Sequence, residues 1–186
     1  DPYTDKVWSE AVYMVNVDTG DVVFEKNAEK KMFPASTTKI MTALCALEYC
    51  DINMTVTISD TASGVEGSSM YLETGEKMTI KELLYGLMLS SGNDAAVAIS
   101  EATECDFIQL MNETADKIGA KNTHFTNPNG LPDDDHYSTC SDMARITAYA
   151  MQNPDFCEIV CTKSYRIEGE GKAYPIEETL ALVMGD

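Results

Sequence analysis

The chain has 186 residues, which is enough for one domain, or two closely packed lobes, with a sizeable core. Apolar residues make up 44% and charged residues 24%, a globular mix that excludes disorder, collagen and coiled coil as whole-chain structures. Lys and Arg total 13 against 31 Asp and Glu, which gives a formal net charge of -18. Because so acidic a surface repels phosphate backbones, we expect no nucleic-acid partner.

The first predicted elements are a β-hairpin and a helix. Residues 10–17 and 22–26 are rich in β-forming side chains and are joined by a Gly-containing turn, which predicts the hairpin. After Pro34, apolar residues recur at helical spacing over residues 37–48. This pattern predicts a buried helix that begins at or near Ser36.

The middle of the chain is predicted to be mostly helical. Thr79 and Glu82 have the spacing of a capping box ahead of the apolar run at 83–89, which predicts a second helix. The other predicted elements are a strand at 54–58, a loop at 62–75, helices at 94–102 and 106–118, a structured loop at 125–137, a helix at 139–151, a short helix from Pro154 and a strand at 162–168.

Strands are therefore expected at both ends of the chain, with helices between them. This order predicts a mixed α/β fold with an antiparallel sheet flanked by helices, in which both chain ends build the sheet around an inserted helical lobe. We place the sheet lobe at 1–60 and 160–186 and the helical lobe at 61–159, with the active site between them.

Targeting signals are not evident in the sequence. No apolar run approaches the roughly 20 residues that span a bilayer. The first residues, Asp1 to Tyr3, lack the basic and apolar regions of a signal peptide, so we expect a processed or trimmed chain.

Six cysteines occur, at Cys45, Cys50, Cys105, Cys140, Cys157 and Cys161. No C-x-x-C pair is present, and Cys157 and Cys161 lack a second close pair, so a structural zinc site is the less favoured interpretation. We expect no cofactor. Mostly buried free thiols are the favoured interpretation. A disulfide between Cys157 and Cys161 stays open, as does the redox compartment.

Ser36 and Lys39 place a hydroxyl at the start of a helix and an amine one turn later. Residues three apart lie on the same side of a helix, so the amine can reach the hydroxyl. A serine needs a base beside it to act as a nucleophile, and lysine is a base only when burial or nearby positive charge lowers its pKa. Taken alone, however, S-x-x-K is more often an ordinary helix cap followed by a surface lysine.

Ser91, Gly92 and Asn93 form a second polar group, at the predicted junction of two helices. Gly92 permits a turn there, and the flanking hydroxyl and carboxamide offer a proton relay and a two-way hydrogen bond for a substrate amide. An isolated Ser-Gly-Asn tripeptide would more often be a plain turn.

Together, residues 34–43 and 83–96, with the loop at 127–138, resemble the serine D-alanyl-D-alanine carboxypeptidases. These are low-molecular-mass penicillin-binding proteins of the β-lactamase/transpeptidase superfamily. The resemblance runs from about residue 8 to 168 and preserves the order of two catalytic motifs. It implies the β-lactamase/transpeptidase fold, with Ser36 as the acylated nucleophile, Lys39 as its base, Ser91 assisting proton transfer and Asn93 holding the substrate.

The same resemblance implies the partners and the location. The substrate would be a peptidoglycan stem peptide ending in D-Ala-D-Ala, and β-lactam antibiotics would be covalent inhibitors. We expect the protein outside the cytoplasm, at the bacterial cell wall.

A third family motif, K-T-G, does not occur among the 186 residues. Lys163 lies on a predicted strand, but it lacks the following Thr-Gly and comes too early in the chain, so it is a poor substitute. We expect either a fragment of a longer carboxypeptidase or a natural variant without this strand. Without the motif's lysine we expect slow acylation, and the incomplete sheet predicts self-association through its open edge.

Three other functions fit part of the pattern. A β-lactamase shares S-x-x-K but would need a deacylating glutamate and usually S-D-N, where this chain has Gly92. A zinc-dependent D-alanyl peptidase would use His124, Asp134 and His136, although two histidines in the chain are few for such a site. A non-catalytic cell-wall-binding remnant is the third alternative, favoured by the missing K-T-G.

Overall fold

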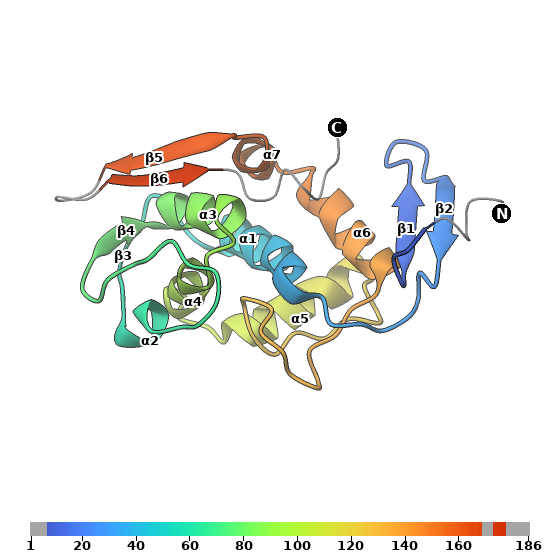
Figure 1. Ribbon diagram of the computed structural model, residues 1–186, viewed down its shortest axis with the longest axis horizontal. Coiled ribbons are helices and arrows are strands. Elements are labelled where there is room, and N and C mark those ends of the chain that lie inside the picture. Colours follow the sequence, from blue (N-terminus) through green and yellow to red (C-terminus); the bar gives the residue numbers. More distant parts are fainter. Residues whose placement is uncertain (1–6, 169–172, 178–186) are drawn as a thin grey trace.

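The computed structural model describes residues 7–168 and 173–177. Figure 1 shows helices gathered around a central helix, with strand pairs at the periphery. In chain order the elements are β1 (Val12–Val15), β2 (Val22–Lys26), the 3-10 turn η2 (Ala35–Thr37), α1 (Thr38–Tyr49), β3 (Thr55–Thr57), α2 (Asp60–Ser63), β4 (Lys77–Thr79), α3 (Ile80–Leu89), α4 (Asn93–Glu101), α5 (Phe107–Ile118), α6 (Cys140–Ala150), α7 (Pro154–Val160), β5 (Ser164–Glu168) and β6 (Ala173–Glu177).

The core is built around α1, which contacts α3, α4, α5, α6 and α7. Met41 and Leu44 on α1 are at most 1% exposed, as the helical spacing of apolar residues predicts. Truncating a leucine as deeply buried as Leu44 to alanine costs about 2–5 kcal/mol. The packing of α1 therefore fixes the position of the residues just before and at its first turn.

Local chain signals set the helix boundaries. The predicted capping box is present: the Thr79 hydroxyl accepts from the Glu82 amide (3.2 Å), and the Glu82 carboxylate accepts from the Thr79 amide (2.7 Å). Gly119 ends α5 with a left-handed φ of 89°, a conformation that glycine adopts without steric cost. Both boundaries confirm the sequence prediction.

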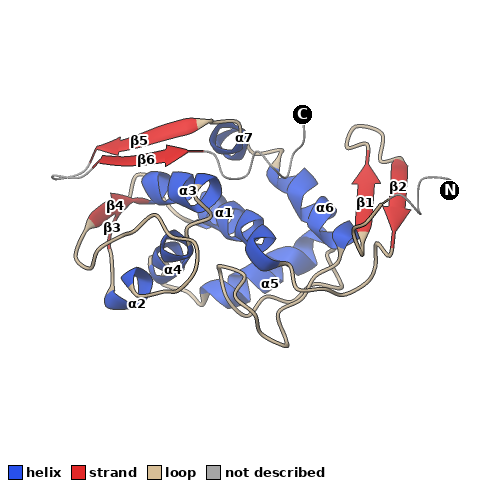
Figure 2. Ribbon diagram, viewed as in Figure 1, coloured by secondary structure: helices blue, strands red, loops and turns tan. Residues whose placement is uncertain are grey.

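The strands form three separate antiparallel pairs among the described residues, β1–β2, β3–β4 and β5–β6. Figure 2 shows these pairs set apart around the helices. The β1–β2 hairpin packs on α6, whereas β5–β6 packs on α3, where the rings of Tyr85 and Tyr165 stack. We expected a single sheet built from both chain ends. Within the part of the chain that is described, the strands do not form such a sheet.

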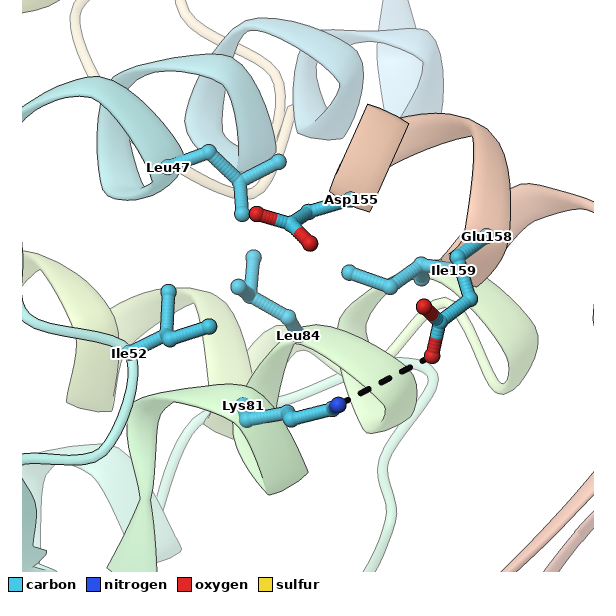
Figure 3. Close-up of a pocket in the computed structure, with 7 residues that line it drawn as sticks. All are labelled: Leu47, Ile52, Lys81, Leu84, Asp155, Glu158 and Ile159. Carbon is cyan, nitrogen blue, oxygen red and sulfur yellow. Dashed lines mark ion pairs between the residues drawn. The ribbon is translucent and has the colours of Figure 1, made fainter. Parts of the chain in front are cut away.

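Helix α7 closes against α1 and α3 around a small cavity of about 10 Å³, room for at most one water molecule. Figure 3 shows Lys81 and Glu158 paired across its edge, with their charged atoms 3.7 Å apart. Its lining residues are Leu47, Ile52, Lys81, Leu84, Asp155, Glu158 and Ile159. None of the four predicted site residues lines this cavity.

All six cysteines are free thiols, including Cys157 and Cys161. Our expectation that most are buried is wrong, since only Cys45 is buried. The other five are partly or fully exposed: Cys157 lies within α7, and the remaining four lie at helix ends or in connections. Within the described residues, no helix is both long and apolar enough to cross a bilayer.

Candidate active site

Ser36 lies in the 3-10 turn that leads into α1, and its side chain is exposed to solvent. The preceding residue, Ala35, has a left-handed φ of 47°, which is strained for alanine. Gly130 packs so closely here that a Cβ on it would overlap the Ala35 carbonyl. The glycine therefore lets the loop after α5 press against the backbone of the turn that carries Ser36.

Lys39 lies one turn beyond Ser36 and is buried, with 2% of its surface exposed. Its Nζ donates to Ser36 Oγ (3.3 Å), to Asn93 Oδ1 (2.7 Å) and to the backbone oxygen of Asn129 (2.7 Å). The three donors of the ammonium are thus all used. When the amine is neutral it keeps two donors for the two short bonds, and its lone pair then faces the Ser36 hydroxyl.

Burial lowers the pKa of Lys39 from 10.5 to about 8, because the charged amine is removed from water. The charge of Asp94 acts in the opposite direction and raises this pKa. With a pKa near 8, roughly a tenth of the Lys39 amines are neutral at pH 7. Lys39 can therefore act as a base toward Ser36 near neutral pH.

Asn93 connects Lys39 to a neighbouring loop. It is 5% exposed, and its Nδ2 donates to the Glu66 carbonyl (2.7 Å) while its Oδ1 accepts from Lys39. The amide still has one free hydrogen and one free lone pair for a further partner. The structure therefore brings Ser36, Lys39 and Asn93 together, as the sequence predicts.

Ser91 lies two residues before Asn93, in the turn between α3 and α4. Its φ of 53° is left-handed, and this conformation costs a non-glycine residue about 1–2 kcal/mol. Strain of this kind persists where the surroundings fix the backbone. Among the described contacts, no hydrogen bond joins the Ser91 side chain to Ser36 or Lys39.

His136 anchors the loop after α5 to the start of α1, a role that sequence reasoning missed. It is fully buried; its Nδ1 accepts from the Thr126 amide (3.0 Å), so its Nε2 carries the hydrogen that is donated to Thr38 Oγ1 (2.8 Å). Burial lowers the pKa of His136, which favours this neutral form.

The carbonyl of Asn129 and the close approach of Gly130 also escaped sequence reasoning. Both residues fall in the Asn-Pro-Asn-Gly segment that resembles a family loop, and this segment was the only signal that could have found them. Every residue has a backbone carbonyl, so residue type alone does not indicate which carbonyl contacts Lys39.

The alternative metal site does not assemble among the described residues, where no three His, Cys, Asp or Glu side chains gather. His124 is exposed and pairs with the Asp135 carbonyl, while His136 is directed toward Thr38. Lys163, the weak substitute for the third motif, is exposed just before β5.

Comparison with known proteins identifies the same family that the sequence motifs resemble. Residues 2–182 match the Peptidase_S11 family model, described as D-alanyl-D-alanine carboxypeptidase. The carboxypeptidase DacF of Bacillus subtilis is 37% identical over 184 residues, which cover 94% of this chain and 47% of DacF. A D-alanyl-D-alanine carboxypeptidase of Streptomyces sp. strain K15 is 38% identical over 168 residues, or 82% of this chain and 58% of the relative. The chain thus spans about half the length of these relatives.

Solved structures extend the similarity to the fold. A Streptomyces K15 DD-transpeptidase mutant superposes with a TM-score of 0.89 at 32% identity, covering 95% of this chain and 76% of that one. A D-alanyl-D-alanine carboxypeptidase from Mycobacterium tuberculosis H37Rv gives 0.89 at 30% identity, covering 95% and 68%. These matches confirm the predicted fold class. The chain therefore belongs to the D-alanyl-D-alanine carboxypeptidase family, peptidase S11.

Proposed function

We propose that this chain carries the acylation site of a serine D-alanyl-D-alanine carboxypeptidase that removes the terminal D-Ala from peptidoglycan stem peptides. The observation that carries the proposal is the buried Lys39 amine, with a pKa near 8, placed 3.3 Å from the Ser36 hydroxyl. A surface lysine after a cap serine would be exposed and charged. This geometry instead suits a base and its nucleophile.

The proposed reaction has two steps. The neutral Lys39 amine takes the Ser36 proton as Oγ attacks the carbonyl carbon of the scissile D-Ala-D-Ala bond. The C–N bond then breaks, and the departing D-Ala nitrogen receives a proton, for which Ser91 is the proposed relay. Water next attacks the acyl-Ser36 ester, which releases the shortened peptide and restores the hydroxyl.

Asn93 is the proposed substrate-binding residue. One Nδ2 hydrogen and one Oδ1 lone pair remain after its bonds to Glu66 and Lys39, and a substrate peptide group can use both. The loop around Asn129 borders the same amine. The proposed site therefore lies where α1, the start of α4 and the loop after α5 meet.

We propose the inhibitors and the location of the protein from its family membership. β-Lactam antibiotics would acylate Ser36, and the protein would act outside the cytoplasm at the bacterial cell wall. The division into a sheet lobe (1–60 and 160–186) and a helical lobe (61–159) also remains our proposal, as does self-association through an open strand edge.

Labelling with a fluorescent penicillin, followed by peptide mapping, tests the proposal. We expect one adduct on Ser36 in the native chain and no adduct in Ser36→Ala. An adduct that persists favours a carboxypeptidase, whereas rapid turnover of the penicillin would favour a β-lactamase. Equal labelling of the native chain and Ser36→Ala, or the absence of any adduct, would refute the proposal.

A further inference from the structure

Asp94 follows Asn93 in the first turn of α4 and is 1% exposed. Its Oδ1 accepts from the amides of Met70 (3.1 Å) and Ala95 (2.9 Å), and its Oδ2 accepts from Ser69 Oγ (2.6 Å) and the Leu72 amide (3.0 Å). All but one of these donors belong to residues 66–72, which we call the strap. The Asp94 carboxylate thus ties the strap to the start of α4.

The strap in turn contacts Asn93. The carbonyl of Glu66 accepts from Asn93 Nδ2 (2.7 Å), and the carbonyl of Ser68 accepts from the Asn93 backbone amide (2.7 Å). Between them, Gly67 has a left-handed φ of 95°, and a Cβ there would lie only 2.5 Å from Asn93 Nδ2. Because the strap holds the nitrogen of the amide, the oxygen is left to face Lys39.

Backbone strain marks the same place. Tyr71 adopts a left-handed φ of 64° although its side chain is 81% exposed and has little packing of its own. Such a conformation is unfavourable for a residue other than glycine and persists only where neighbouring contacts impose it. Here the amides on either side, those of Met70 and Leu72, both donate to Asp94. The strap is therefore held in a shape it would not otherwise prefer.

We propose that Asp94 is a positioning residue for acylation: its carboxylate clamps the strap, and the strap holds the Asn93 amide with its oxygen on the Lys39 amine. The inference rests on the proposed roles of Ser36, Lys39 and Asn93. It gives a part in the reaction to a residue outside the S-x-x-K and S-x-N motifs.

Electrostatics and positioning make opposite predictions for Asp94. The carboxylate raises the pKa of Lys39, so removing the charge favours the neutral amine and by itself would speed the attack of Ser36. Removing the clamp frees the Asn93 amide to rotate away from Lys39 and would slow it. The direction of the rate change therefore separates the two roles.

Asp94→Asn is the test, because its NH2 group cannot accept from the donors of the strap. We expect labelling of Ser36 by fluorescent penicillin at pH 7 to slow by about 10-fold or more, since a misplacement of about 1 Å at the site can cost about 100-fold. We also expect faster hydrogen exchange of the Asn93 side-chain amide by NMR. This exchange does not depend on activity. It therefore tests whether Asp94 holds the Asn93 amide even if the native chain fails to label.

Asp142→Asn is the matched control. Asp142 is also buried (3% exposed) in the first turn of a helix and also pins a neighbouring loop, but it makes no contact with the strap. Asn93 exchange should stay at its native value in this variant. Labelling is not compared, because the loop that Asp142 pins continues to Asn129, whose carbonyl contacts Lys39. Ser69→Ala removes one of the clamp bonds and should slow labelling a few-fold, which keeps the test decisive if Asp94→Asn does not fold.

The proposal is overturned if folded Asp94→Asn labels as fast as the native chain or faster, or if the Asn93 exchange is unchanged. For the case in which Asp94→Asn is unfolded, an unchanged Asn93 exchange in Ser69→Ala overturns it. An equal rise in Asn93 exchange in the Asp94 and Asp142 variants overturns it as well, because the change would then reflect general destabilisation.

Discussion

Replacing Lys39 by methionine should change how stability depends on pH. Methionine has nearly the same length as the lysine stem but does not titrate, so the variant removes one ionisation and little volume. The pKa of Lys39 is about 8 in the folded protein against an ordinary value of 10.5. Between these values the unfolded chain binds more protons than the folded one.

The sign follows from proton linkage. Where the unfolded state binds more protons, the free energy of unfolding rises with pH. The Lys39 contribution is therefore most unfavourable below pH 8 and disappears above pH 10.5. Integrating between pH 7 and pH 10 gives a rise of about 2–3 kcal/mol in the native protein relative to the variant.

The difference between the two proteins at one pH is a poorer test. Methionine removes a buried charge but leaves Asn93 Oδ1 and the Asn129 carbonyl without a donor, at about 1–3 kcal/mol each. The change of the difference with pH avoids this problem. Burial raises the pKa of both Cys45 and Tyr85, but these groups are present in both proteins, so their contributions cancel.

Urea unfolding of both proteins at pH 7, 8, 9 and 10 provides the measurement. We expect the free energy of unfolding of the native chain, minus that of Lys39→Met, to increase by about 2–3 kcal/mol over this range. If the difference in the free energy of unfolding stays constant or falls with pH, burial does not lower the pKa of Lys39, and this prediction is wrong.

Three further predictions concern neighbouring groups. Gly130→Ala should lower the melting temperature far more than Gly20→Ala in a thermal scan; both glycines have positive φ, but only at Gly130 would a Cβ overlap a backbone carbonyl, and equal losses would contradict this. Burial lowers the pKa of His136, so the free energy of unfolding should fall as pH drops below about 6.5, and urea titrations of His136→Leu should lack this part of the fall. Asn93→Asp would place an anion beside Lys39 and raise its pKa, so penicillin labelling at pH 7 should slow by about 10-fold; an unchanged rate would count against Lys39 as the base.

Sequence reasoning succeeded where a feature depends on neighbouring residues. Thr79 and Glu82 meet because capping is a contact between residues three apart, and Gly119 ends its helix for a similarly local reason. Ser36 and Lys39 are within reach of each other because one helical turn separates them. Short-range geometry is encoded directly in residue spacing.

The rest depends on segments distant in the chain. The Asn129 carbonyl reaches Lys39 only because the loop after α5 folds back on α1. The clamp on Asp94 depends on the strap, some 25 residues earlier in the chain. Backbone groups supply most of these bonds, and every residue type carries them, so no residue pattern marks them.

The pH dependence of Ser36 acylation tests the central claim most directly. Rates of β-lactam adduct formation on Ser36 should rise about 10-fold from pH 7 to a plateau, with a midpoint near the Lys39 pKa of about 8, and should be lost in Lys39→Met. A rate that is flat across this range, a midpoint near the ordinary lysine value of 10.5, or full labelling of Lys39→Met would contradict Lys39 as the base for Ser36.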